Sequence, residues 1–178
     1  ERDVCGGTGG KAVTMGQYLS GGEGFAWDKK ESKVRTLSKF ISRFNLDKIK
    51  PMVVDTLRPP RDFFSTADLV LVDAPCSGWG TIRRNPEILL KNPDLEDLSR
   101  QQFSLLLSAS SLVKKGGVMV YCVCSITKKE TQKVVKEWEL NAGKEWEKVG
   151  LGKGEEEMII WPHQFNSDGF FVAAWRKK

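Results

Sequence analysis

A short strand runs into a glycine-rich loop in the stretch Arg2-Asp3-Val4-Cys5-Gly6-Gly7-Thr8-Gly9-Gly10-Lys11. Glycines let the backbone turn sharply and approach a ligand closely, and the helix that follows offers free N–H groups at its N-terminus. Lys11 is followed by Ala12 rather than by serine or threonine, so this is not a Walker phosphate loop. Taken alone, the loop fits either a ligand site or a simple tight turn.

Apolar runs and amphipathic stretches alternate outward from this loop. The predicted strands are Arg2–Cys5, Gly24–Trp27, Met52–Val54, Leu69–Val72, Val118–Val123, Met158–Trp161 and Phe170–Trp175, and the predicted helices are Ala12–Leu19, Ser32–Phe44, Leu95–Lys114 and Lys129–Glu139. This alternation predicts an α/β fold with an open, doubly wound, mainly parallel sheet. The last two strands are separated by too few residues for a helical crossover, so we expect them to pair antiparallel at one edge.

The long helix over Leu95–Lys114 is expected to stop at Lys115-Gly116-Gly117, a basic last turn followed by glycine. We expect residues 1–178 to form a single domain. Because the first strand is so short before its loop, we also expect the chain to lack sequence that normally precedes it.

The composition is that of an ordinary globular protein, with 40% hydrophobic and 29% charged residues among 178. A net charge of +5 favours an anionic partner such as nucleic acid, the alternative being a merely basic surface. No apolar run is long enough to span a membrane and no signal peptide is evident, so we expect a cytoplasmic protein without membrane association. The four cysteines and single histidine lack the spacing of a zinc site, and we expect no metal and no disulfide framework.

Carboxylates stand at the ends of three successive predicted strands, namely Asp28, Asp55 and Asp73. In a doubly wound sheet, ligands bind beyond the carboxyl ends of the strands, and an acid after the second strand can bind a ribose. Singly, each residue would be a turn or cap residue. Together they predict a nucleoside-shaped site, which NAD would also fit.

Two cysteines follow the next strands, Cys76 in D-A-P-C-S-G and Cys124 in V-Y-C-V-C-S. We expect both to rim one crevice, and we interpret Cys122 as a buried structural thiol. A thiolate that adds to carbon 6 of cytosine makes carbon 5 nucleophilic toward a methyl donor, which is covalent catalysis. The ring nitrogen then needs an acid, and Asp73 is the candidate, either protonated or sharing a proton with the base.

The motifs together resemble the Sun/RsmB (Fmu) family of S-adenosylmethionine-dependent RNA cytosine-C5 methyltransferases. The matching strings are D-V-C-G-G-T-G-G-K, D-A-P-C-S-G-W-G-T-I-R-R-N-P-E, V-Y-C-V-C-S-I and D-G-F-F-V-A-A-W-R-K. The resemblance implies a Rossmann-like class I methyltransferase fold and S-adenosyl-L-methionine as the cofactor. It implies that the cofactor contacts Asp3, Cys5, Gly6, Gly7, Thr8, Gly9, Gly10, Lys11, Asp28, Lys33, Asp55, Asp73 and Pro75.

The same resemblance assigns the chemistry. Cys124 is the nucleophile, Cys76 assists breakdown of the adduct, and Asp73 and Lys11 contact the cytosine. Arg83, Arg84 and Asn85 are expected to lie close to the RNA, which would be ribosomal or transfer RNA, and we expect a monomer. Chemistry alone does not choose between the two thiols, because DNA cytosine methyltransferases use the Pro-Cys thiol; the choice of Cys124 rests on the resemblance.

The chain departs from the family pattern at three positions. Thr8 replaces a proline, Val123 stands where threonine is usual, and Cys122 stands where serine is usual. These changes predict altered donor affinity or thiol activation. They keep open a catalytically weak RNA-binding module, and an NAD-dependent oxidoreductase is the third hypothesis.

Three further side chains have two interpretations each. Trp79 and Phe171 would either stack on a base or belong to the core, and the core is the commoner place for aromatic residues. His163 lies in a connecting segment and is interpreted as structural rather than catalytic.

Overall fold

The computed structural model describes residues 10–19, 21–152 and 154–178, together with the backbone of residues 2–4. The strands are β1 (Arg2–Val4), β2 (Gly24–Asp28), β3 (Ile49–Val53), β4 (Ala67–Asp73), β5 (Val113–Val123), β6 (Trp146–Lys148), β7 (Glu157–Ile160) and β8 (Phe170–Lys177). The α-helices are α1 (Gly10–Tyr18), α2 (Glu31–Arg43), α3 (Leu95–Ser110), α4 (Gln132–Ala142) and α5 (Pro162–Phe165). Short 3-10 helices are η1 (Arg61–Phe63), η2 (Trp79–Thr81), η3 (Pro86–Leu90) and η4 (Gly143–Glu145).

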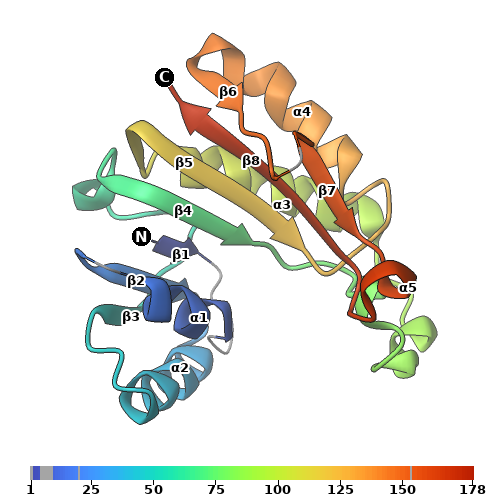
Figure 1. The fold of residues 1–178 in the computed structure, drawn as a ribbon, viewed down its shortest axis with the longest axis horizontal. Coiled ribbons are helices and arrows are strands. Elements are labelled where there is room, and N and C mark those ends of the chain that lie inside the picture. The colour runs from blue at the N-terminus through green and yellow to red at the C-terminus, as the bar shows by residue number, and fades with distance from the viewer. Residues whose placement is uncertain (1, 5–9, 20, 153) are drawn as a thin grey trace.

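The strands form one mixed sheet in the order β3-β2-β1-β4-β5-β8, with β6 and β7 both paired to the far side of β8 (Figure 1). The pairs from β3 to β5 are parallel, and β8 is antiparallel to β5, β6 and β7. This confirms the predicted doubly wound sheet of the Rossmann-like class I type. The chain reverses its strand order between β1 and β4, which is where such sheets bind ligands.

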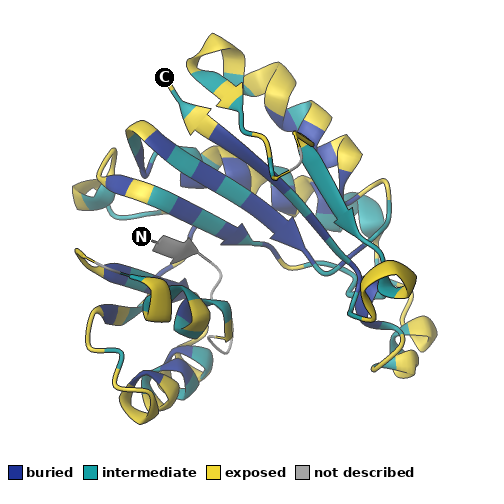
Figure 2. Ribbon diagram, viewed as in Figure 1, coloured by how far each residue is buried: buried dark blue, intermediate teal, exposed yellow. Residues whose placement is uncertain are grey.

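Helices cover both faces of the sheet, as two adjacent residues of β2 make clear. Ala26 packs with Leu37 and Ile41 of α2, whereas Trp27 belongs to the larger core that contains residues of α3 and α4. Successive side chains of a strand point to opposite faces, so α1 and α2 lie on one face and α3 and α4 on the other. Figure 2 shows the buried residues along β5 and β8 and the exposed outer surfaces of the helices.

The structure corrects the predicted boundary between the long helix and the strand that follows it. Helix α3 ends at Ser110 rather than Lys114, because Leu112 and Val113 are fully buried and already belong to the sheet region. Val113 pairs with Ala67 in β4, and an irregularity in the β4–β5 register separates this pair from the regular ladder. Gly116, with φ of +79°, therefore bends strand β5 instead of ending a helix.

The predicted antiparallel pairing of the last two apolar runs is confirmed, since Ile159 of β7 is opposite Phe171 of β8. The antiparallel strand β8 is not itself the edge, because β6 and β7 cover its outer side. Strand β6 has only three residues and carried no apolar alternation that would have predicted it. In the described part of the chain, no helix has the length and apolarity needed to cross a membrane.

Candidate active site

A cavity of about 660 Å³ opens beyond the carboxyl ends of the parallel strands. Its walls include nine of the residues predicted from the sequence: Lys11, Asp28, Lys33, Asp55, Asp73, Pro75, Cys76, Arg84 and Cys124. Gly10, Arg83 and Asn85 are described but do not line it. Of the predicted glycine loop, Cys5, Gly6, Gly7, Thr8 and Gly9 and the side chain of Asp3 lie outside the described residues.

One end of the cavity carries the acid that ends β2 and the acid that follows β3. Asp28 is buried, with one oxygen accepting from the Lys30 backbone N–H at 2.8 Å and the other 3.4 Å from Lys33 Nζ. Asp55 is exposed and caps a turn by accepting from the Leu57 N–H at 3.1 Å. The neighbouring Val54 adds apolar wall, so this end combines a fixed carboxylate with a hydrophobic surface.

The other end carries the two cysteines. The β4–β5 ladder pairs Asp73 with Cys122, which places the ends of these strands side by side. The Sγ atoms of Cys76 and Cys124 lie 3.2 Å apart, and both thiols are free and half-buried. The predicted convergence of the two thiols on one crevice is therefore confirmed.

Close backbone contact holds these two loops against the segment that leads into β8. Gly80 N–H donates to the Cys124 carbonyl at 2.9 Å, and Gly169 N–H donates to the Gly80 carbonyl at 2.7 Å. A Cβ at Gly80 would lie 2.0 Å from the Gly169 oxygen. Only glycine fits at position 80, which explains this residue of the D-A-P-C-S-G-W-G string.

The environment makes the two thiols unequal. A hydrogen bond from Cys76 lowers the pKa of Cys124 to about 7, against the opposing effect of burial, with a smaller contribution from the charge of Lys11. The hydrogen bond to Cys124 and burial raise the pKa of Cys76 well above its ordinary value. At neutral pH a large part of Cys124 is therefore thiolate, while Cys76 is a thiol that donates to it.

A lysine–aspartate pair borders the thiols. Lys11 Nζ lies 2.8 Å from Asp73 Oδ2 and 5.4 Å from the centre of the Phe170 ring. Burial lowers the pKa of Lys11, but the charge and hydrogen bond of Asp73 outweigh it and leave the pKa raised, so Lys11 is charged. Cys122 is buried as predicted, and its thiol also donates to Asp73 Oδ1 at 3.5 Å, so its interpretation as inert filler is incomplete.

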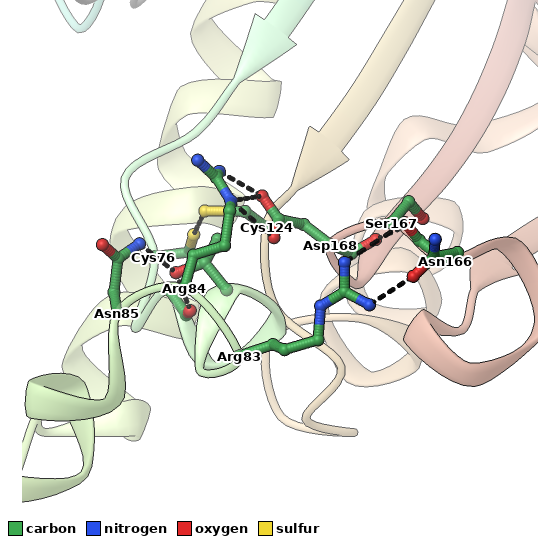
Figure 3. Close-up of polar contacts among 10 residues, drawn as sticks. Cys76, Arg83, Arg84, Asn85, Cys124, Asn166, Ser167 and Asp168 are labelled. Atoms are coloured by element: carbon green, nitrogen blue, oxygen red, sulfur yellow. Dashed lines mark hydrogen bonds and ion pairs between the residues drawn. The ribbon is translucent and has the colours of Figure 1, made fainter.

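The predicted RNA-contacting residues lie in the segment of η2 and η3 and connect it to the loop before β8 (Figure 3). Arg84 Nε donates to both carboxylate oxygens of Asp168, at 2.9 and 3.0 Å, and Arg83 donates to Asn166 Oδ1 at 2.6 Å. Asn85 donates to Thr81 Oγ1 at 3.1 Å. The Arg84 side chain is still 65% exposed and, like Asp168, lines the cavity.

Among the aromatic candidates, Phe171 is fully buried and belongs to the core, whereas its neighbour Phe170 lines the cavity. Trp79 is half-buried and is absent from the cavity wall. His163 lies in the short helix α5, away from the cavity lining. Nowhere among the described residues do three His, Cys, Asp or Glu side chains gather as a metal site requires.

The whole arrangement matches a known family. The model of the family described as 16S rRNA methyltransferase RsmB/F matches residues 2–176. The chain belongs to the RsmB/F family. It is 33% identical to the probable ribosomal RNA small subunit methyltransferase B of Bacillus subtilis (strain 168), over 99% of this chain and 42% of that protein. It is 33% identical to the ribosomal RNA small subunit methyltransferase F of Shewanella halifaxensis, over 82% of this chain and 33% of that protein.

Two solved structures are similar to the chain over almost its whole length. PH0851 superposes with a TM-score of 0.91 at 35% identity, over 99% of this chain and 42% of that one. NSun6 from Pyrococcus horikoshii, solved with SFG, gives a TM-score of 0.81 at 26% identity, over 99% and 47%. The chain thus spans less than half the length of each of these four proteins.

Sequence reasoning missed one acidic residue of the site. Glu130 was placed inside a helix predicted over Lys129–Glu139, but α4 begins only at Gln132 and Glu130 is fully buried before it. Its carboxylate binds Ser77 and Ser125, which follow the two cysteines. The signal in the sequence was a serine after each cysteine, and it gave no hint of a shared partner.

The favoured interpretation of Phe171 as a core residue is confirmed, and the aromatic residue that sequence reasoning missed is its neighbour Phe170. In β8 the alternation of side chains sends Phe171, Ala173 and Trp175 into the core, so Phe170 faces the other way. The period of two was visible in F-F-V-A-A-W, and it could have singled out Phe170 as the residue on the cavity side.

Proposed function

We propose that this RsmB/F-family chain transfers a methyl group from S-adenosylmethionine to carbon 5 of a cytosine in RNA, with Cys124 as nucleophile. The observation that carries the proposal is the contact of the two thiols at 3.2 Å, inside the same cavity as the Lys11–Asp73 pair. A half-buried thiol pair of this kind has no use in the NAD-dependent hypothesis. It suits a base that must be attacked at one carbon and deprotonated at the next.

The cavity has residues that fit the donor. Asp28 has the burial and the position after β2 to accept hydrogen bonds from ribose hydroxyls, and Val54 and Leu57 offer apolar wall to the adenine near Asp55. Asp3, Lys33 and Pro75, with the loop from Cys5 to Lys11, complete the proposed donor site. When bound, S-adenosylmethionine supplies an electrophilic methyl group on sulfur. Asp28, Lys33 and Asp55 line the same cavity as the two thiols, which supports a shared site for donor and base.

The first proposed step uses Cys124. Its thiolate forms a bond to carbon 6 of a cytosine that has left its stack, and the electrons of the C5–C6 double bond make carbon 5 nucleophilic. Protonation of nitrogen 3 neutralises the negative charge that this addition places on the ring. Lys11 carries that proton beside Asp73, and Asp73 passes it to the ring or shares it with the base.

The second proposed step uses Cys76. After carbon 5 has gained its methyl group, its remaining proton must leave, and the C6–S bond must break to restore the double bond and release the Cys124 thiolate. Once Cys124 is a neutral thioether, the thiolate that raised the pKa of Cys76 is gone. The pKa of Cys76 therefore falls, and Cys76 loses its own proton to solvent. Its thiolate then takes the proton from carbon 5 while the C6–S electrons leave with Cys124, and nitrogen 3 returns its proton to Asp73.

The RNA class follows from the relatives, whose names specify the small-subunit ribosomal RNA. We propose ribosomal RNA as the substrate, with Arg83, Arg84 and Asn85 near its backbone. A cytoplasmic location and a monomeric state stay predictions.

Incubation with labelled S-adenosylmethionine and small-subunit ribosomal RNA tests the function. Wild-type protein should label carbon 5 of cytosine, and Cys124→Ala should abolish the labelling. Cys76→Ala should accumulate a protein–RNA complex that survives denaturation, because the adduct forms but does not break down. RNA binding by the wild-type protein without methyl transfer would favour the RNA-binding module, and a denaturation-resistant complex in Cys124→Ala instead would move the nucleophile to Cys76.

A further inference from the structure

Glu130 is a fully buried carboxylate beneath the two cysteine-bearing loops. Its Oε1 accepts from the Ser77 backbone N–H at 2.7 Å and from Gln102 Nε2 at 3.1 Å. Its Oε2 accepts from the hydroxyls of Ser77 and Ser125, each at 2.6 Å, and of Thr127 at 2.9 Å. Burying a carboxylate is costly unless its oxygens are satisfied, and here neutral donors surround both of them.

The donors are not scattered through the fold. Ser77 directly follows Cys76, and Ser125 directly follows Cys124. One carboxylate therefore binds the residue next to each thiol, across two loops that are 48 residues apart in sequence.

We propose that Glu130 is a positioning residue that holds Cys76 and Cys124 at contact distance, so that the two thiols act as a pair. Glu130 touches neither thiol in the interactions described above. Its catalytic effect, as distinct from its effect on geometry, rests on the proposed function.

The proposed role of Glu130 depends on its negative charge. Burial raises the pKa of Glu130, but hydrogen bonds from Ser125, Ser77 and Thr127 outweigh it and leave the pKa below its ordinary value, so the residue is ionised at neutral pH. A carboxylate accepts at both oxygens, whereas glutamine would present an NH₂ group to some of the same donors. The interactions thus require the ionised acid rather than its shape alone.

Glu130 is itself fixed from outside the loops. The buried Tyr121 hydroxyl donates to the Glu130 backbone carbonyl at 2.7 Å, and Gln102 also donates to the Pro75 carbonyl at 2.9 Å. Glu130 is therefore bound to strand β5 through its backbone carbonyl and to helix α3 through its carboxylate, and both elements belong to the core.

Bridging of the free thiols by dibromobimane, which becomes fluorescent when it joins two nearby thiols, tests the geometry without any substrate. Wild-type protein should bridge rapidly, and Cys76→Ala should abolish the signal, which assigns it to this pair. Glu130→Gln should slow bridging and lower kcat for methyl transfer, each by at least about tenfold, the effect of losing one hydrogen bond to a charged group. The KM for S-adenosylmethionine should stay within about twofold of wild type, because Glu130 does not line the cavity.

Glu139→Gln is the matched control, because it makes the same substitution at a carboxylate that binds Trp175 and Lys148 rather than the cysteine-bearing loops. It should keep the bridging rate. Wild-type bridging in Glu130→Gln would overturn the proposal.

Should Glu130→Gln fail to fold, Ser125→Ala removes one contact to Oε2 and should still slow bridging, and an unchanged rate in it would overturn the proposal too. Failure of the proposed function would be seen separately, as a wild-type protein that bridges its thiols but transfers no methyl group.

Discussion

At the scale of the residue, two cysteines of the same kind acquire different chemistry from their surroundings. Cys76 donates its proton to Cys124, and the pKa values of the two thiols move in opposite directions. The lowered pKa of Cys124 suits the nucleophilic role that we propose for it from the family resemblance, since the thiolate is the reactive form.

The pH dependence of thiol alkylation tests this inequality. The pKa of Cys124 lies below its ordinary value, so its thiolate fraction rises as pH increases through about 7. Iodoacetamide should modify Cys124 with a midpoint near that pH. In Cys76→Ala the midpoint should move upward by about one pH unit or more, which corresponds to about 1.4 kcal/mol, because the main cause of the lowered pKa is lost.

Cys76→Ser is the matched variant for the alkylation experiment, because a serine hydroxyl can still donate to the thiolate. Its midpoint should lie between those of wild type and Cys76→Ala. A midpoint in Cys76→Ala that equals the wild-type midpoint would show that another group lowers the Cys124 pKa.

Sequence could predict the thiols, Asp73 and Lys11, because each stands in a motif at a strand or helix end. It could not predict Glu130, because a charged residue among lysines in K-K-E-T-Q is typical of an exposed surface. Only the tertiary placement of Ser77 and Ser125 makes the site of Glu130 polar enough to bury it.

At the scale of the element, the site depends on three chain segments that meet at backbone distance. The η2 segment, the end of β5 and the loop before β8 are joined through Gly80 and Gly169. Gly80 stands in D-A-P-C-S-G-W-G and Gly169 in D-G-F-F, two of the strings that match the family. Local propensity cannot predict which distant carbonyl either glycine approaches.

Substitution of Gly80 by alanine tests this junction. The new Cβ would overlap the Gly169 carbonyl oxygen and also crowd the Cys124 carbonyl, so the loops must separate. We expect the free energy of unfolding in urea to fall by about 2 kcal/mol or more. Gly21→Ala is the control, because Gly21 is exposed with open space around it, and it should change stability by no more than about 0.5 kcal/mol.

A loss of stability in Gly80→Ala no larger than in Gly21→Ala would contradict the tight junction.

The end of α3 also shows that a local sequence pattern does not predict a tertiary contact. The helical spacing of apolar residues continued to Leu112, but α3 ends at Ser110 because Val113 already pairs with Ala67 of β4.

At the scale of the whole molecule, alternation of strands and helices sufficed to predict the sheet and the edge at which the cavity opens. The insertion of β8 between β5 and the outer strands was not predicted, because a short connection specifies which strands pair but not which neighbour lies on the other side. The net charge of +5 predicted an anionic partner, and Lys29, Lys30 and Arg84 do lie in the cavity wall.

The salt dependence of RNA binding tests where this charge acts. The logarithm of the binding constant should fall linearly with the logarithm of salt concentration, by about 0.7 for each phosphate contact to a single strand. Arg83→Gln should make the slope shallower by about one such contact. Arg43→Gln is the control, because it also removes one positive charge. Arg43 ends α2, whereas the cavity residue Lys33 lies near the start of that helix, so this variant should leave the slope unchanged.

Equal salt-dependence slopes for the two arginine variants would mean that only the net charge of the protein affects RNA binding. A shallower slope confined to Arg83→Gln would place phosphate near the segment of η2 and η3.

The most direct test of the central claim identifies the atom that attacks the base. RNA that carries 5-fluorocytosine has fluorine where carbon 5 must lose a proton, so the adduct forms and cannot break down. After incubation with S-adenosylmethionine and digestion, mass spectrometry of the wild-type complex should find the methylated nucleotide on the peptide that contains Cys124. A nucleotide on the Cys76 peptide instead, or free RNA with both thiols unmodified, would contradict the account.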